Sequence, residues 1–291
     1  MDRSVSLRGA VLLGLGSILG TGVFVSLGLA VGVTGVWAVP ALCLAALLAG
    51  LNALSSAQLA ANHPVSGGTY AYGYRYLSPE LGFGAGLAFL LAKSASAAAA
   101  AIGLAGYVLA GLGLGPALTS LVASITVLAM TALVVLGLRR ANPVNAMLVS
   151  ITLGVLTLLA IMALAAPAAP QDPAPAALFS PAGFLEAAAL LFVAFTGYGR
   201  IATLGEEVRA PRRTIPRAII LTLIISTCLY LAILLGGLNV LGLAEFAGAT
   251  ADTAAPLQAV AARLDAPWLG PLVAVAAVTA MAGVLLNLIL G

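Results

Sequence analysis

The sequence predicts an all-α membrane protein with about eight transmembrane helices, and three observations support this fold class. Of the 291 residues, 62% are hydrophobic. Only 7% are Asp, Glu, Lys or Arg, whereas a soluble domain carries roughly 25%. Apolar runs of about 20 residues, the length that crosses the hydrocarbon core of a bilayer, recur along the whole chain. This composition excludes a soluble enzyme and a disordered chain.

Eight apolar runs account for most of the chain, and each is interpreted as a transmembrane span that lies in the lipid bilayer. The first run is not a signal peptide, because it is too long, is rich in glycine and is followed by seven further runs. The runs cover residues 10–32, 36–60, 82–111, 116–138, 144–166, 184–205, 216–240 and 269–290.

The arginines between these runs predict the orientation. With the N-terminus in the cytoplasm, Arg263 alone among the loop arginines falls outside, and the positive-inside rule is obeyed. We therefore expect a multi-pass protein of the cell (plasma) membrane with a cytoplasmic N-terminus. The net charge of +3 comes from these dispersed arginines, so no nucleic-acid partner is expected. The cytoplasmic residues are Arg3, Arg8, Arg75, Arg139, Arg140, Arg209, Arg212, Arg213 and Arg217.

Residues that carry out covalent or metal chemistry are scarce. The two cysteines, Cys43 and Cys228, lie in separate apolar runs, and His63 is the one histidine. No spacing typical of a disulfide framework or a metal site is present. We expect no metal, no cofactor and no enzymatic activity.

The first span contains a glycine-rich interruption, GSILGTGVF at residues 16–24. Each glycine weakens a helix by about 1 kcal/mol relative to alanine, and backbone unwinds inside a membrane only where protein or a wet cavity surrounds it. Unwound backbone offers N–H groups to a carboxylate and carbonyls to an ammonium group, which suits a zwitterion. The alternative is close helix packing, since Gly16 and Gly20, like Gly28 and Gly32, have GxxxG spacing.

A second interruption, FTGYG at residues 195–199, lies in the sixth span and is followed by Arg200. Spans one and six would be corresponding members of a five-plus-five repeat. Broken helices at corresponding positions of two halves indicate a transporter site. The paired placement, more than the glycines themselves, therefore favours binding over packing.

Lys93 lies in the third span, where a cation costs roughly 2.5–3.5 kcal/mol. One interpretation is a lysine that reaches water or helix carbonyls. The other is an amine that faces the substrate or carries a coupled proton.

Two cytoplasmic segments are also distinctive. Residues 62–80 hold four of the seven tyrosines, as expected for an aromatic belt at the membrane interface. The loop after the sixth span combines acidic and basic residues, either as a topogenic loop or as a cytoplasmic gate. The gate candidates are Glu206, Glu207, Arg209, Arg212 and Arg213.

Together these stretches resemble the amino acid–polyamine–organocation superfamily of permeases. The resemblance implies an inverted-repeat fold of five plus five helices, with spans one and six broken. The first repeat covers 1–166, an outer Pro/Ala-rich linker 167–183, and a partial second repeat 184–291. The family pattern continues beyond residue 291, so the resemblance implies a chain truncated after the eighth span. The matching stretches are GSILGTGVF at 16–24, PVSGGTYAYGYRYL at 64–77, FVAFTGYGRIATLGEEVRAPRRTIPRAI at 192–219 and AMAGVLLNLILG at 280–291.

The resemblance also implies which residues bind substrate at the two breaks. Thr21 and Gly22 would receive the carboxylate of an amino acid. The full set is Ile18, Gly20, Thr21, Gly22, Phe192, Val193, Phe195, Thr196 and Gly197.

By the same resemblance, the carbonyls of Ile18, Val193 and Thr196 would face the α-ammonium group. Phe192 or Phe195 would cover the site. Many relatives carry a large aromatic residue at the place of Val193.

The driving force stays open at this point. Some proton-driven relatives carry a lysine at the place of Thr152, and a threonine does not replace that amine. We expect a secondary active transporter that moves an amino acid by alternating access, coupled to H⁺ or to exchange. The alternative is a truncated, non-transporting membrane protein: a relic, a partner subunit or an amino acid sensor. Neither the amino acid nor the oligomeric state follows from the sequence.

Overall fold

The computed structural model describes residues 5–62, 68–136, 142–169, 179–202 and 208–290, and these residues are almost entirely helical. Apart from the helices, an isolated parallel bridge joins Val5 to Val208. The elements in chain order are α1 (Leu7–Ile18), η1 (Gly22–Ser26), α2 (Leu27–Thr34), η2 (Gly35–Trp37), α3 (Ala38–Asn62), α4 (Gly68–Tyr76), α5 (Pro79–Gly111), η3 (Pro116–Leu118), α6 (Thr119–Val135), α7 (Asn142–Ala165), α8 (Pro181–Phe195), η4 (Thr196–Tyr198), α9 (Gly199–Ala202), α10 (Pro211–Thr253), α11 (Pro256–Arg263) and α12 (Leu269–Leu290).

The expected transmembrane organisation is confirmed. Within the described residues, seven helical segments are long and apolar enough to cross a membrane. One of them, Gly22–Ala60, runs from the second half of span one through η2 into span two, while α1 is a shorter apolar helix. The predicted spans one and six are both interrupted, at α1–η1–α2 and at α8–η4–α9.

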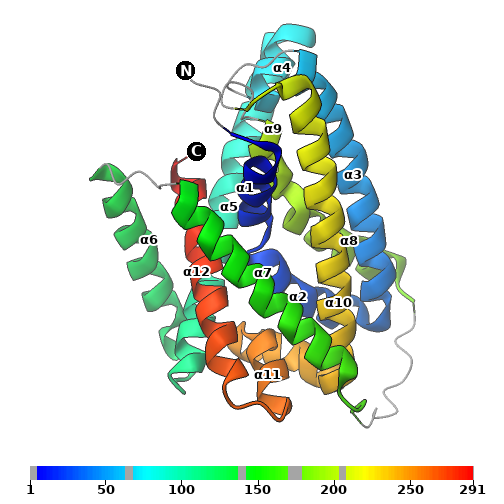
Figure 1. Ribbon diagram of the computed structural model, residues 1–291, viewed down its shortest axis with the longest axis vertical. Helices are drawn as coiled ribbons and strands as arrows, with labels where there is room; N and C mark the ends of the chain where they lie inside the picture. Colours follow the sequence, from blue (N-terminus) through cyan, green and yellow to red (C-terminus); the bar gives the residue numbers. More distant parts are fainter. Residues whose placement is uncertain (1–4, 63–67, 137–141, 170–178, 203–207, 291) are drawn as a thin grey trace.

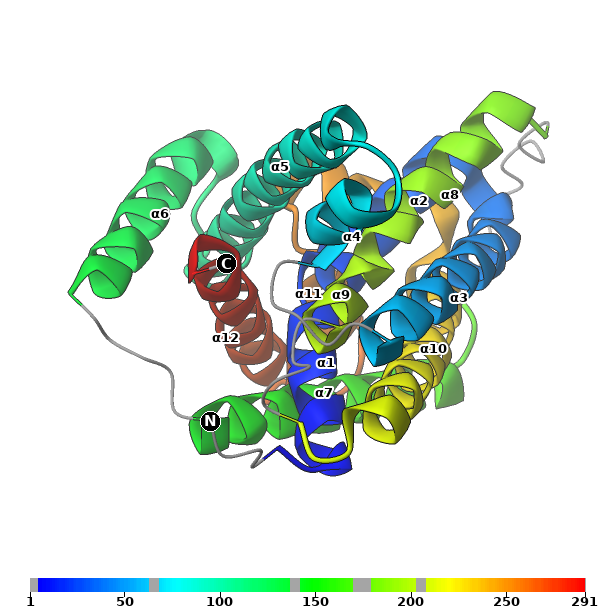
Figure 2. The ribbon, with the colours of Figure 1, turned by 90° about the horizontal axis from the view of Figure 1, so that it is seen from above.

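The broken helices occupy the middle of the bundle. Figure 2 shows α1 and α9 near the centre, with α5 and α12 on one side and α3 and α10 on the other. Helix α6 lies at the edge, beside α5 and α12. Helix α4 lies toward one end of the molecule and α11 toward the other (Figure 1). Both breaks are thereby enclosed by the other helices.

A stripe of alanines on α3 explains how this helix packs closely against α8 and α10. The alanines recur every three or four residues, so they share one helix face. Small side chains allow helix backbones to approach closely, and van der Waals contacts then stabilise the pair within the membrane. The stripe, buried to within 2% exposure, is Ala38, Ala41, Ala45, Ala49, Ala53, Ala57 and Ala60.

Helix α10 is too long for one span, since 43 residues would extend about 65 Å if they were straight. The helix turns at Gly242, whose φ of 72° and ψ of −178° are accessible to glycine and strained for other residues. The residues after Gly242 lead to α11 at the end of the molecule opposite α4 (Figure 1). Asn239, just before the turn, donates to the carbonyls of Ala163 and Ala166 at 3.0 and 2.9 Å. It thereby caps the end of α7.

Candidate functional site

The first break begins at Leu19, one residue before Gly20. Helix α1 ends at Ile18, because Leu19 adopts a non-helical ψ of 89°. The chain resumes as a five-residue π-helical turn that begins at Gly22, and Thr21 makes no side-chain cap before it. The first N–H groups of a helical segment have no intrahelical carbonyl. The break therefore presents carbonyls from α1 and N–H groups from the following turn.

The second break follows Phe195, where α8 gives way to the 3-10 turn η4 and then to α9. The hydroxyl of Thr196 donates to the carbonyl of Val193 at 2.8 Å, and the Thr196 amide donates to the same oxygen. The Gly199 amide in turn donates to the Thr196 carbonyl. Two carbonyls expected to face the α-ammonium group thus have donors from this chain in the structure.

The two breaks pack directly against each other. A Cβ atom added to Gly197 would overlap the carbonyl oxygen of Ser17 and lie 2.8 Å from Cγ1 of Ile18. A Cβ atom added to Gly22 would lie 2.6 Å from Cβ of Ala194. Glycine is required at both positions because the backbones approach so closely. The packing and binding interpretations of these glycines therefore apply to the same contact.

Sequence reasoning missed Tyr230 of α10, which is fully buried beside both breaks. Its hydroxyl donates to the Ile18 carbonyl at 2.9 Å and lies 3.4 Å from the Ala194 carbonyl. A tyrosine in the middle of an apolar run is the signal that could have identified it. Tyr107 of α5 is equally buried; its hydroxyl donates to the Phe24 carbonyl at 2.9 Å and accepts from the Leu257 amide at 3.3 Å.

The other expected site residues surround the breaks to different degrees. Phe195 is fully buried, with its ring centroid 5.2 Å from that of Tyr230. Phe192 is partly buried, whereas the Val193 side chain is 54% exposed. Ile18, Gly20 and Gly22 are buried and Thr21 is partly buried. The structure therefore gathers the backbone of the two breaks around Phe195, and the side chain of Val193 points away from this cluster.

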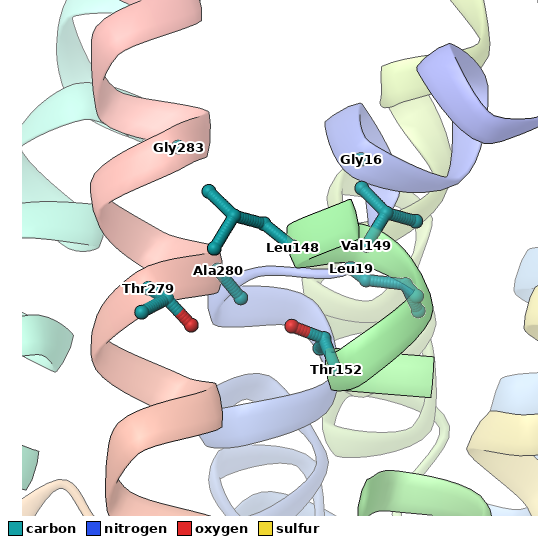
Figure 3. Close-up of a pocket in the computed structure, with 8 residues that line it drawn as sticks. All are labelled: Gly16, Leu19, Leu148, Val149, Thr152, Thr279, Ala280 and Gly283. Carbon is teal, nitrogen blue, oxygen red and sulfur yellow. The ribbon is translucent and has the colours of Figure 1, made fainter. Parts of the chain in front are cut away.

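A small cavity lies beside the first break, between α1, α7 and α12 (Figure 3). It has room for about one water-sized molecule. The hydroxyls of Thr152 and Thr279 face each other across it. Thr279 donates to the Val275 carbonyl at 2.8 Å, whereas the buried Thr152 hydroxyl has no hydrogen-bond partner among the described residues. Thr152, at whose place the resemblance implies a lysine in some proton-driven relatives, therefore lies beside the break in α1.

Lys93 lies in α5, as expected, and its side chain is partly buried. Its ammonium nitrogen is 5.3 Å from the centroid of the Phe89 ring, within range of a cation–π interaction. The ammonium group of Lys93 therefore lies against an aromatic side chain of its own helix.

The expected gate lies at the start of α10, and only its basic members are described. Glu206 and Glu207 fall outside the described residues. Arg212 and Arg213 are exposed, as is Arg209. The Arg209 amide donates to the Val5 carbonyl at 3.0 Å. The loop after span six is thus attached to the segment that precedes α1.

Comparison with known proteins identifies similar sequences along the full length. The family described as amino acid permease matches residues 9–290. An uncharacterized transporter of Mycobacterium tuberculosis is 42% identical over 294 residues, which cover 100% of this chain and 64% of that protein. The branched-chain amino acid permease BcaP of Bacillus subtilis is 31% identical over 312 residues, covering 100% of this chain and 65% of the relative. A methylthioribose transporter of Bacillus subtilis is 30% identical over 253 residues, covering 80% of this chain and 54% of the relative. The chain thus spans slightly less than two thirds of the first two relatives and about half of the third.

Proposed function

The chain belongs to the amino acid permease family, and from this premise we propose that it carries an amino acid across the membrane by alternating access. The observation that carries the proposal is the direct contact between the two broken helices at Gly22 and Gly197. Backbone that is unwound in the middle of a membrane is costly unless its polar groups have partners. A zwitterionic substrate supplies partners of both signs.

The substrate carboxylate binds the N–H groups around Thr21 and Gly22, at the start of the π-helical turn. A helix N-terminus favours negative charge, because its N–H groups and its dipole both point toward the ligand. The α-ammonium binds the carbonyls at the C-terminal ends of α1 and α8, where the dipole has the opposite sign. The carbonyls proposed for this role belong to Ile18, Val193 and Thr196.

The side chain of the substrate is neutral and apolar in this proposal. Apolar groups such as Phe195 and Ile18 surround the breaks, and the acidic side chains in the described part of the chain are all exposed. A cationic side chain would need a nearby carboxylate in a medium of low dielectric constant. One relative is named as a branched-chain amino acid permease. The described acidic residues are Glu80, Glu186, Glu245, Asp252 and Asp265.

Transport is coupled to H⁺ or to exchange in this proposal, with Lys93 as the candidate proton carrier. Thr152 faces the break without a titratable group, so Lys93 is the candidate amine within the spans. The protein is oriented in the plasma membrane with its N-terminus in the cytoplasm. Arg75 of α4 and the arginines at the start of α10 then lie on the cytoplasmic side.

A second candidate function is a membrane protein that binds an amino acid without moving it. This chain aligns with 64% of the length of the uncharacterized transporter of Mycobacterium tuberculosis. The relic, partner-subunit and sensor forms of this idea all predict either binding without uptake or neither of the two.

Reconstitution into liposomes tests both candidates. Purified chain is reconstituted and uptake of radiolabelled leucine is measured with and without an imposed pH gradient, beside binding in detergent. Saturable uptake supports the transporter. Binding without uptake refutes transport and supports the sensor form of the second candidate. The absence of both refutes leucine transport and agrees with the relic or partner-subunit form.

A further inference from the structure

The hydroxyl of Tyr230 lies where the ends of two broken helices meet. Its oxygen is 2.9 Å from the Ile18 carbonyl of α1 and 3.4 Å from the Ala194 carbonyl of α8. The residue itself is fully buried. One side chain on α10 therefore contacts the C-terminal ends of both helices.

These two carbonyls need donors because of their positions. Ile18 is the last residue of α1, and Ala194 lies in the last turn of α8. The last four carbonyls of a helix have no intrahelical partner, and an unsatisfied carbonyl in an apolar interior is destabilising. A hydroxyl has one proton, so the shorter contact, to Ile18, receives the stronger hydrogen bond.

The surroundings hold the phenol in this position. Its ring packs against Phe195, with centroids 5.2 Å apart and planes at 40°. On the other side, a Cβ atom at Gly22 would lie only 2.8 Å from the Tyr230 oxygen. The absent side chain of Gly22 thus provides the space that the hydroxyl occupies.

The hydrogen bond from Tyr230 restrains the direction in which the Ile18 carbonyl points. A carbonyl oxygen has two lone pairs, so a bond from Tyr230 leaves one for a second donor. In the proposed function, on which this inference rests, that second donor is the α-ammonium group of the substrate. We propose that Tyr230 is a positioning residue, whose hydroxyl orients the Ile18 carbonyl toward the ammonium group and makes the site selective for amino acids over carboxylic acids that lack it.

The experiment compares two ligands that differ only at the amine: leucine and its desamino analogue, 4-methylpentanoate. Their dissociation constants are measured by calorimetry for the full chain in detergent, for wild type and Tyr230→Phe. The control is Tyr107→Phe, which also removes a buried hydroxyl that donates to a backbone carbonyl. We expect Tyr230→Phe to reduce the preference for leucine by about tenfold, as when one charge-assisted hydrogen bond weakens. Tyr107→Phe should leave the preference unchanged.

The outcomes separate this inference from the proposed function. A wild-type chain that binds no leucine overturns the proposed function and the inference with it. A wild-type preference for leucine that Tyr230→Phe leaves intact, or that both variants reduce equally, overturns the inference alone. If Tyr230→Phe does not fold, 4-aminophenylalanine at position 230 decides, because it keeps a donor of similar size. Wild-type preference in that variant supports the inference, and a lost preference overturns it.

Discussion

Substitution of Gly197 by alanine should destabilise the protein, because the two helix breaks are in contact at this residue. The added Cβ atom would lie 2.5 Å from the carbonyl carbon of Ser17 and 2.8 Å from Cγ1 of Ile18, whereas ordinary contact begins at 3.4 Å. The breaks must then separate by about 1 Å in a close-packed interior. Such overpacking typically costs about 1–3 kcal/mol.

Gly199, two residues further along, provides a matched control. It has helical backbone angles, φ −55° and ψ −27°, and an added Cβ atom would meet nothing within 4 Å. Alanine in a helix is about 0.5–1 kcal/mol more favourable than glycine, so Gly199→Ala should raise the stability slightly.

The two variants are compared by thermal unfolding in the same detergent, monitored by tryptophan fluorescence. Gly197→Ala should unfold several degrees below wild type, and Gly199→Ala at or above it. Equal unfolding temperatures for Gly197→Ala and wild type would show that the two breaks do not touch at this residue, and would refute the close approach of α1 and η4.

Three further substitutions test the cap of α7, the coupling candidate and the second break. Asn239→Ala leaves the carbonyls of Ala163 and Ala166 without this donor and should lower the free energy of unfolding by about 1–3 kcal/mol. Asn52 is exposed, so Asn52→Ala should have no effect. Equal unfolding temperatures for Asn239→Ala and wild type would contradict the cap. Lys93→Met should abolish the stimulation of leucine uptake by an inward pH gradient if Lys93 carries the proton, and unchanged stimulation would exclude it. Thr196→Val removes the hydroxyl that donates to the Val193 carbonyl, so the substrate ammonium no longer has to displace that hydroxyl. Leucine should then bind a few-fold more tightly. Weaker binding would mean that the hydroxyl itself contacts the substrate.

The broken helices were predictable from the sequence, but their contact was not. Glycines at 16–24 and 195–199 indicate where a helix is weak, and both interruptions occur in the structure. Which atoms fill the space beside a glycine depends on the partner helix. Here Ser17 lies against Gly197 and Ala194 against Gly22, over separations of more than 170 residues. No local pattern encodes contacts of that kind.

The hydrogen-bond partner of Tyr230 was likewise not predictable from the sequence. Its hydrogen bond to Ile18 joins residues 212 positions apart. The sequence shows a tyrosine in an apolar run, and physical chemistry requires that its buried hydroxyl find a partner. The choice of Ile18 follows from the break in α1, because a regular helix would already have used that carbonyl. The sequence therefore predicts a free carbonyl at the break and a buried hydroxyl on α10, but not that the two meet.

The close approach at Gly22 changes how a substrate-site variant should be interpreted. A leucine at this position would collide with Ala194 and with the Tyr230 hydroxyl whether or not a substrate binds there. Loss of binding in Gly22→Leu would therefore be expected from packing alone. Variants that remove a donor while keeping the volume, such as Tyr230→Phe, separate the two roles.

The hydrogen bonds at the breaks also bear on how strongly a substrate can bind. The Ile18 carbonyl accepts a hydrogen bond from Tyr230 and the Val193 carbonyl accepts one from Thr196, so both carbonyls have a donor without a ligand. A substrate ammonium that binds Val193 replaces a hydrogen bond within the protein as well as its own bonds to water. The net gain is then the difference between a charge-assisted bond and a neutral one, rather than the whole of either. Such an exchange favours moderate affinity, which suits a carrier that must also release its substrate on the other side of the membrane.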